Sequence, residues 1–543
     1  MDQSRLMSSE GLEALDYAAI ALYLLLTFGI ALWFGRRQKN TEDFFVGGRR
    51  MPWLAVGLSI LATLFSTLTY IGMPGEVIKN GIGLFCGYLA IPFSFSVVMF
   101  LWVPFFMRLR LTSAYEYLEH RFNYPVRVLG ATLFICLRLG WMSMVVFVAS
   151  MTLDHIKGAD WAWLPGPDLY WWIGMIGFIA AIYTSLGGIQ AVIWVDVLQC
   201  VLLLAGVLLT IGYIAIVDHS GPIEWWRVTT ATTPHHTAPP VFSFDLTIRL
   251  TIVTAMINNF FWTICTHGSD QVVLQRYFST SSLAAARRSY VTNIVVDVTM
   301  VGLLSLAGLA MLAFYVRHTG LLPAGQSPIT MGDKLLPYFF GHQLPAGCAG
   351  LMMSAFLCDA IQTLESGVNG ITAVVVKDFI SRTKKSGDAE VDSASQVSEG
   401  SAKKLSLARC LAFVIAVLVA SNAFVVAYVQ ERLGLTIVEM MPRFFNMFVG
   451  PLAAMFFIGM FLPRCTTRSL LPAVLCGLLL SVVWSWWEVI FQTKSRPTFL
   501  LAIAVPCVTT FTIAAILGVL FNRQHDHPGL KFTWWSVVRG PPP

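Results

Sequence analysis

An apolar segment at residues 61–81, LATLFSTLTYIGMPGEVIKNG, is rich in groups that could bind a cation. It contains five hydroxyl side chains followed by three helix-weakening residues: Thr63, Ser66, Thr67, Thr69 and Tyr70, then Gly72, Pro74 and Gly75. Gly and Pro are tolerated in membrane helices where the freed backbone groups line a cavity. We therefore expect the helix to break here, with an ion and a solute bound at the break. The alternative is a proline-kinked packing helix whose hydroxyls bond back to the backbone.

A second set of oxygen-bearing side chains lies in the stretch FLCDAIQTLESGVNG. Asp359, Gln362, Thr363 and Ser366 follow helical spacing, so they share one face of a helix. Glu365 lies in the same stretch, and Asp196 lies in another apolar segment. Because an ionisable group inside a membrane is costly, each of these acids is a functional candidate.

The segment INNFFWTICTHGSDQVVLQRYF, residues 257–278, is also interrupted by polar and small residues. The interrupting residues are Asn258, Asn259, Thr263, Thr266, His267 and Gly268. Interrupted spans at corresponding places in two halves of a chain indicate a transporter site. Because this segment is the fifth span after the first interrupted one, we expect two five-helix repeats, at about 52–216 and 246–462.

Basic residues inside apolar segments allow more than one interpretation. Arg138 could clamp a solute carboxylate through paired hydrogen bonds. It could instead neutralise a buried acid such as Asp196 or Glu365, or lie at a helix end. Glu439 and Arg443 are four residues apart, so we expect an ion pair along one helix.

The elements that must position these residues are membrane helices. Of the 543 residues, 56% are hydrophobic and only 12% are charged, whereas soluble proteins have about 25% charged residues. Spanning a bilayer takes about 20 apolar residues. We expect thirteen spans, at 15–35, 52–78, 82–105, 128–152, 168–187, 191–216, 246–267, 290–315, 344–372, 409–429, 434–462, 470–490 and 497–521.

Loop charges predict the orientation of these spans. The loops after odd-numbered spans and the C-terminal tail hold 24 of the 36 Lys and Arg residues, and the opposite side holds nine. Cytoplasmic loops carry the excess of Lys and Arg. We therefore expect an extracellular N-terminal tail at 1–14, a transmembrane domain at 15–522, a disordered cytoplasmic loop at 383–404 and a cytoplasmic tail at 523–543.

Other function classes find little support. No extramembrane segment is long enough for a nucleic-acid-binding or catalytic domain, and neither HExxH nor GxSxG occurs. The ten cysteines are scattered without a CxxC motif, and the pair His235 and His236 lacks further metal ligands nearby. We expect no enzyme activity, no cofactor and no metal other than the coupling ion.

Several stretches together resemble the sodium:solute symporter family. They are FFVGGRRMPWLAVGLSILAT, YIGMPGEVIKNG, SAYEYLEHRF, YTSLGGIQAVIWVDVLQ, SDQVVLQRYFS and FNMFVGPLAAMFFIGMFLP. They occur in the family's order, and the resemblance covers residues 15–522. SAYEYLE and GMPGEV look most like the branch of iodide, multivitamin and monocarboxylate carriers. The resemblance implies a LeuT-type inverted-repeat fold, sodium coupling and alternating access.

The resemblance also implies two cation sites. The first uses the carbonyls of Ala62, Phe65 and Asp359 and the side chains of Gln362 and Thr363. The second uses Asp196, Gln362, Glu365 and Ser366. Gln362 stands where the family usually has a small hydroxyl residue, and Glu365 replaces a hydroxyl and adds a charge. Proton or mixed coupling is therefore the alternative to sodium.

For the solute, the resemblance favours an organic anion, either a monocarboxylate or sialic acid. Ser66, Thr69 and Arg138 resemble residues of sialic acid carriers, whereas span 290–315 lacks the Lys of sugar carriers. The expected solute-binding residues are Ser66, Thr69, Tyr88, Arg138, Asn259 and Thr263. The alternatives are a neutral solute such as a sugar or amino acid, a transporter-fold sensor, and uncoupled transport. Membrane lipid is an expected partner, and the oligomeric state stays open.

Overall fold

The computed structural model describes residues 13–35, 47–109, 111, 113–157, 167–183, 189–232, 239–375, 394–493, 495–521 and 528–540. These residues form α-helices with short 3-10 and π-helical segments, and none of them lies in a β-strand. This arrangement confirms the expected all-α class.

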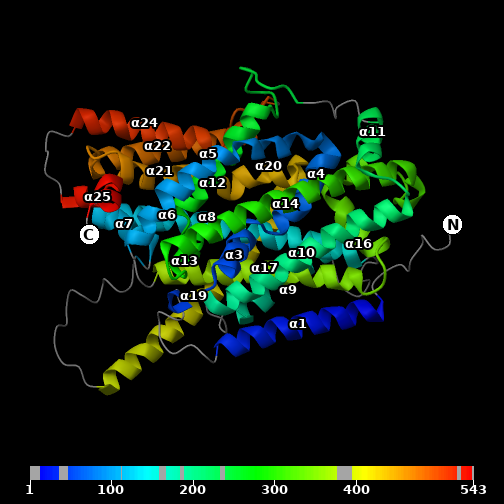
Figure 1. The fold of residues 1–543 in the computed structure, drawn as a ribbon, viewed down its shortest axis with the longest axis horizontal. Coiled ribbons are helices and arrows are strands. Elements are labelled where there is room, and N and C mark those ends of the chain that lie inside the picture. The colour runs from blue at the N-terminus through cyan, green and yellow to red at the C-terminus, as the bar shows by residue number, and fades with distance from the viewer. Residues whose placement is uncertain are drawn as a thin grey trace.

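The long helices and the segments continuous with them form most of the molecule (Figure 1). They are α1 (Ala14–Gly35), α3 (Trp53–Leu64), α4 (Thr67–Asn80), η3 (Ile82–Ala90), α5 (Ile91–Val97), η4 (Val98–Trp102), α6 (Val103–Leu109), α8 (Tyr124–Lys157), α9 (Asp168–Tyr183), α10 (Ile189–Val217), α12 (Ile252–Ser269), α13 (Gln271–Phe278), α14 (Leu283–Arg317), α17 (Cys348–Val374), α19 (Ala394–Leu433), α20 (Ile437–Met441), η8 (Pro442–Asn446), α21 (Met447–Phe461), α22 (Thr467–Ser485) and α24 (Ala504–Phe521).

Shorter elements connect the long helices. They are η2 (Gly47–Arg49), α7 (Ala114–Arg121), α11 (Pro222–Thr232), η5 (Thr319–Leu321), α15 (Pro328–Met331), η6 (Gly332–Lys334), α16 (Leu335–His342), α23 (Trp487–Ile490), η9 (Phe499–Leu501), η10 (Pro528–Phe532) and α25 (Trp534–Arg539).

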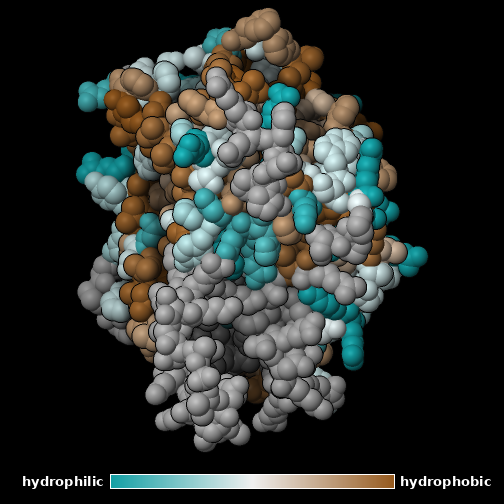
Figure 2. All heavy atoms as spheres, turned by 90° about the vertical axis from the view of Figure 1, so that its left-hand side faces the viewer, coloured by the Kyte–Doolittle hydropathy of each residue, from teal (hydrophilic) through white to brown (hydrophobic). Residues whose placement is uncertain are grey.

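The long helices run mainly along one direction of the molecule, with α8, α14 and α17 between the outer helices α1 and α24 (Figure 1). The outer helices expose large apolar side chains such as Leu25 and Leu520. Exposed apolar flanks of this kind suit contact with lipid. Figure 2 looks onto the end of the molecule that carries α25, where hydrophilic residues gather, while hydrophobic residues cover much of the flanks.

Each of the thirteen expected spans coincides with a helix or a broken helix. Within the described residues, nine helices are long and apolar enough to cross a membrane, and the bent pair α3 and α4 raises this number to ten. The helices α9, α12 and α17 fall outside that group. The multi-span architecture is thus present, while the count of thirteen and the orientation stay predictions.

The first interrupted span does break, but earlier than the glycines and the proline suggested. α3 ends at Leu64 and α4 begins at Thr67, and the helix direction bends by 62° between them. Gly72, Pro74 and Gly75 all lie inside α4. A Cβ at Gly75 would stand 2.1 Å from an oxygen of Asp333, so this glycine permits close packing. The expected break in the segment 61–81 is therefore confirmed, but it lies at Phe65 and Ser66 and not at these three residues.

The second interrupted span also breaks at a different residue. α12 continues through Asn258, Asn259 and Thr263 to Ser269. The break comes at Asp270, whose backbone is extended (φ −79°, ψ 117°) and whose side chain caps α13 by accepting the Val272 N–H. Asn258, Asn259 and Thr263 lie within the intact helix and line a cavity described below. The expected interruption of the span 257–278 is therefore confirmed, but it lies at Asp270 and not at the residues 258–268 that were expected to cause it.

Two expected terminal and loop segments fall only partly within the described residues. In the loop expected at 383–404, residues 394–404 form the beginning of α19, and residues 383–393 lie outside the described part. In the expected tail, η10 and α25 pack on the helix bundle. The Trp534 indole N–H donates to the Leu101 carbonyl at 3.0 Å, and Arg108 donates to the Val537 carbonyl at 3.0 Å.

Candidate functional site

Most of the expected cation ligands surround one small cavity. It has a volume of about 10 Å³, roughly one water-sized sphere. Its walls include the expected ligands Ala62, Asp196, Asp359, Gln362, Thr363 and Ser366, together with Thr63, Arg138, Gln199 and Arg276. We call this space the ion cavity. Neither Phe65 nor Glu365 belongs to its walls.

The side chain of Asp359 caps the second half of the broken helix. The Thr67 backbone N–H donates to Asp359 Oδ2 at 2.7 Å, and the Thr67 hydroxyl donates to the same oxygen. Gln199 Nε2 donates to the other oxygen, Oδ1. A carboxylate is favoured at a helix N-terminus, because the first N–H groups are free and the helix dipole is positive there. Asp359 therefore holds the break in shape with its carboxylate, a role beyond the carbonyl ligand that the resemblance implied.

Asp196 forms an ion pair with an arginine side chain of the protein. Arg276 Nη2 lies 3.1 Å from Asp196 Oδ2, and both side chains are almost fully buried. Ser59 Oγ also donates to Oδ2, and Gln362 Nε2 donates to Oδ1 at 2.5 Å. The carboxylate that was expected to bind the second cation is thus bound by the Arg276 guanidinium.

Two buried oxygens near this cluster have no hydrogen-bond partner among the described residues. Gln362 donates its amide N–H groups to Val192 and Asp196, which leaves its Oε1 without a donor at the wall of the ion cavity. Glu365 Oε1 is likewise buried and without a partner. A buried unpartnered acceptor is costly. Gln362 Oε1 is therefore chemically suited to bind a hard cation.

Arg138 binds an acid of the protein itself. Its Nη2 lies 2.5 Å and 2.6 Å from the two oxygens of Asp270, and both side chains are buried. This pair joins α8 to the break between α12 and α13. Arg138 lies at the ion cavity and away from the larger cavity described next. The structure thus has Arg138 neutralising a buried acid, although that acid is neither Asp196 nor Glu365.

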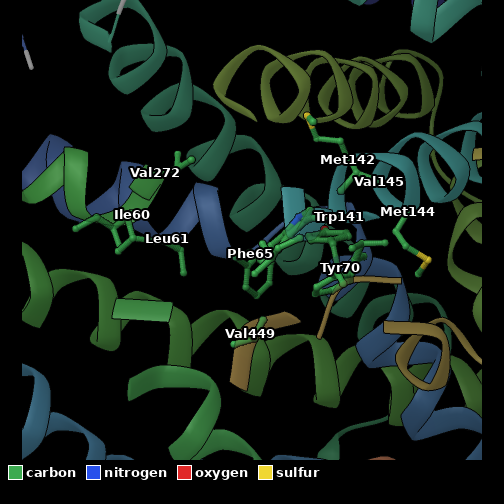
Figure 3. Packing of buried hydrophobic residues seen from close by; sticks show 14 of the residues in the cluster. Ile60, Leu61, Phe65, Tyr70, Trp141, Met142, Met144, Val145, Val272 and Val449 are labelled. Atoms are coloured by element: carbon green, nitrogen blue, oxygen red, sulfur yellow. The ribbon is translucent and has the colours of Figure 1, made fainter. Parts of the chain in front are cut away.

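A larger cavity lies on the other side of the α3–α4 break. Its volume is about 180 Å³, and we call it the solute cavity. Five expected residues line it: Phe65, Thr69, Tyr88, Asn259 and Thr263. Ser66 and Arg138 do not. Figure 3 shows Phe65, at the break, and Tyr70, within α4, among the buried hydrophobic residues, which also include Trp141.

The solute cavity has mainly apolar walls that carry a few polar side chains and one acidic residue. Four asparagines line it, Asn258, Asn259, Asn293 and Asn446. Its titratable groups are Asp297, His267 and Tyr88, and no Lys or Arg is among its described lining residues. His267 Nδ1 contacts the Tyr277 hydroxyl at 2.7 Å. Asparagine amides both donate and accept hydrogen bonds, so this cavity suits a small polar solute.

A network of ion pairs lies one helical turn beyond the solute cavity. Arg249 binds Glu76 of α4 through two contacts of 2.5 Å and 2.8 Å, and it binds Glu439 of α20 at 2.8 Å. Arg496 also binds Glu439, at 2.9 Å. The cavity-lining residue Met73 precedes Glu76 by one turn of α4. The network therefore ties together elements that also form the cavity walls.

The expected Glu439–Arg443 side-chain pair is absent from the described contacts. Arg443 Nη1 donates to the Glu439 backbone carbonyl, and Arg443 Nη2 binds Glu488. The Glu439 carboxylate is taken by Arg249 and Arg496 instead. The expected pair is therefore wrong, because helical spacing places two side chains near each other but does not rank partners from other helices.

A second contact of this region joins Lys79, near the end of α4, to Asp333 of η6 at 3.4 Å. Burial raises the pKa of Asp333, and the neighbouring Lys79 opposes that rise. Asp333 also accepts the Ile437 backbone N–H at 3.3 Å, at the start of α20. Asp333 thus links α4 to α20 next to the Arg249 network.

Some site residues were missed in the sequence. Arg276 was not among the expected site residues, because it follows the expected span 246–267, yet its side chain is buried at the ion cavity. Asp297 was not among the expected site residues, although its position within the apolar span 290–315 is a signal that could have found it. Gln199 and Ser59 carried no comparable signal, because neutral polar residues are common in membrane helices.

The broken helices, the ion cavity and the adjacent solute cavity together define a secondary transporter. Comparison with known proteins then gives the family. The chain belongs to the sodium:solute symporter family, which it matches over residues 44–477. It is accordingly a multi-pass protein of the cell membrane that carries out sodium-coupled solute symport.

Individual relatives agree with this assignment. The chain is 28% identical to the sodium/sialic acid symporter NanT of Aliivibrio fischeri, over 88% of this chain and 89% of the relative. It is 29% identical to the human sodium/iodide cotransporter, over 89% of this chain and 71% of the relative. It is 28% identical to the mouse sodium-coupled monocarboxylate transporter 1, over 86% of this chain and 72% of the relative.

Solved structures confirm the LeuT-type fold. A Na⁺-coupled sialic acid symporter in a substrate-bound outward-open state superposes with a TM-score of 0.75 at 25% identity, covering 94% of this chain and 98% of the other. Mhp1, a nucleobase-cation-symport-1 family transporter, superposes with a TM-score of 0.50 at 14% identity and supports the fold alone.

Proposed function

We propose that the solute carried with sodium is a small organic anion. The observation that carries the proposal is the shared wall between the two cavities. Ala62 and Thr63, at the end of α3, line the ion cavity, and Phe65, at the break, lines the solute cavity. An ion bound on one side of this short segment therefore lies close to a solute on the other side.

The side chains of the solute cavity, which include Asp297, do not favour an anion by themselves, so the positive charge has to come from the coupled ion. Lys and Arg are missing from the described lining of the solute cavity, so an anion there lacks a positive side chain of its own. Sodium in the ion cavity would supply the positive charge, and charges a few ångströms apart interact strongly in a low-dielectric interior. The sialic acid, iodide and monocarboxylate carriers named above all transport anions, which supports the same class.

For the cation sites we propose two sets of ligands. The first set comprises backbone carbonyls at Ala62, Phe65 and Asp359 with the side-chain oxygens of Gln362 and Thr363; the unpartnered Gln362 Oε1 supports it. A second set comprises Asp196, Gln362, Glu365 and Ser366. Because Arg276 now holds Asp196, occupation of this second site requires the guanidinium to move.

We further propose that alternating access uses the two broken helices. The repeats at 52–216 and 246–462 are supported by breaks at corresponding places, after α3 and after α12. The Arg249 network joins α4 to α20 beyond the cavity, so it would hold one access path closed. By the predicted orientation this side is extracellular. We propose no enzyme activity, no nucleic-acid partner and contact with membrane lipid.

Uptake into proteoliposomes tests the proposal. Vesicles containing the purified protein would be given radiolabelled sialic acid, pyruvate or iodide, with an inward gradient of sodium or of choline. We expect uptake of sialic acid or pyruvate in sodium and none above empty vesicles in choline, and uptake of iodide alone would contradict an organic anion. Uptake that is equal in sodium and choline would contradict coupling. Sodium-driven uptake restricted to a neutral sugar or amino acid would contradict the anionic class.

A further inference from the structure

Asp297 is an acidic residue in the solute cavity to which no function has been given above. It lies on α14, and its neighbours on the same helix face, Asn293 and Ile294, also line the cavity. The side chain is half-buried, with its exposed part in the cavity, and the Tyr88 hydroxyl from η3 faces its carboxylate.

A carboxylate here repels a bare anion. No Lys or Arg of the described cavity lining offsets its charge, and the Tyr88 hydroxyl can satisfy only part of its acceptor capacity, because a carboxylate offers about four acceptor positions. A solute that enters must therefore bring hydrogen-bond donors to this end of the cavity. Otherwise the acceptor positions lose water without replacement, which weakens binding.

We propose that Asp297 is a specificity-determining residue that accepts hydrogen bonds from hydroxyl or amine groups of the solute. This inference rests on the proposed anion transport and narrows its substrate class. The preferred solute carries a negative charge together with hydroxyl or amine donors that bind Asp297. Hydroxylated acids fit this description, whereas iodide and unsubstituted short carboxylates do not.

A matched pair of probes tests the inference. Lactate and propanoate have the same charge and nearly the same size, and differ by one hydroxyl group. Binding of each, and of sialic acid and iodide, would be measured by the thermal shift of the purified full chain in saturating sodium. For the wild type we expect sialic acid and lactate to bind about tenfold or more tightly than propanoate and iodide, as hydrogen bonds to charged groups allow.

Variants connect this preference to Asp297. Asp297→Asn should reduce the lactate-to-propanoate preference to about twofold or less, chiefly by improving propanoate binding. Tyr88→Phe should keep or increase the lactate-to-propanoate preference, because it frees an acceptor position on Asp297. This variant provides the test if Asp297→Asn does not fold. Thr299→Val is the matched control: it lies on α14, its exposed hydroxyl only bonds back to the Val295 carbonyl, and it should change nothing.

The outcomes separate this inference from the proposed function. A sodium-dependent shift with propanoate or iodide equal to that with lactate would overturn the role of Asp297 while leaving anion transport standing. An unchanged preference in Asp297→Asn would do the same. If none of the four anions shifts the protein in sodium, the proposed anion transport fails, and this inference fails with it.

Discussion

The carboxylate of Asp359 on α17 accepts the backbone N–H of Thr67, 2.7 Å away at the first residue of α4. The two residues are 292 positions apart in the chain and belong to opposite halves of the transporter. This contact fixes the start of the second half of the broken helix. It also places the Asp359 carboxylate at the wall of the ion cavity, where we propose that its charge favours a bound cation.

Two substitutions of Asp359 should separate these roles. Asp359→Ala removes the helix cap and should lower the free energy of unfolding by about 1–2 kcal/mol. Asp359→Asn keeps an acceptor for Thr67 but loses the charge, so it should retain more stability while weakening sodium binding about tenfold, or 1.4 kcal/mol. Denaturant unfolding and sodium titration of both variants measure these effects. If both variants bind sodium as tightly as the wild type, the charge of Asp359 has no role in sodium binding.

The buried pair of Asp196 and Arg276 should behave as a unit. Arg276→Met leaves a buried unpaired carboxylate and should destabilise the protein by about 3–5 kcal/mol. The double variant with Asp196→Leu removes both charges and should recover most of that loss. The free energy of unfolding of the single and double variants forms the test. A double variant as unstable as Arg276→Met would show that the two residues act independently.

Arg138→Lys should reduce stability without changing solute selectivity. Asp270 occupies the guanidinium with two contacts, and Lys cannot reproduce the planar donor geometry. Uptake of anionic and neutral solutes by the variant, compared with Asp270→Asn as a matched control, measures selectivity. A selective loss of anion uptake in Arg138→Lys alone would show that this guanidinium reaches the solute after all.

Arg249→Gln should loosen the closure beyond the solute cavity. The variant loses the charged contacts to Glu76 and Glu439 that join α4 to α20. We expect a membrane-impermeant thiol reagent to label Met73→Cys several-fold faster in this variant, in a background without reactive cysteines. Arg227→Gln, a basic residue of α11 outside the network, is the control. Equal labelling rates in all three proteins would mean that the network does not control access.

The sequence predicted the overall architecture and most of the ion cavity for physical reasons. Long apolar stretches specify membrane helices, because backbone groups in lipid must be paired internally. The spacing of Asp359, Gln362, Thr363 and Ser366 places them on one helix face, and the structure has all four at the same cavity. Local periodicity was sufficient here because the residues belong to one helix.

The partners of charged residues could not be predicted in the same way. Arg138 with Asp270 and Arg276 with Asp196 are pairs between different helices, and each depends on packing that no local pattern specifies. Both breaks lie in the segments expected to break, at 61–81 and 257–278, but their exact residues were not predicted, for a related reason. Gly72 and Pro74 weaken a helix, but the actual ends at Leu64 and Ser269 depend on caps from Asp359 and Asp270.

The most direct test of the central claim is sodium binding at the ion cavity, measured as the thermal stability of the purified protein in sodium against choline. Thr363 lines that cavity, and its hydroxyl is a proposed ligand. We predict that the wild type is stabilised by sodium in a concentration-dependent way, as linkage requires. We predict that Thr363→Ala needs about tenfold more sodium for the same shift, with its stability in choline unchanged. An identical sodium dependence in the two proteins, or no effect of sodium on either, would contradict the account.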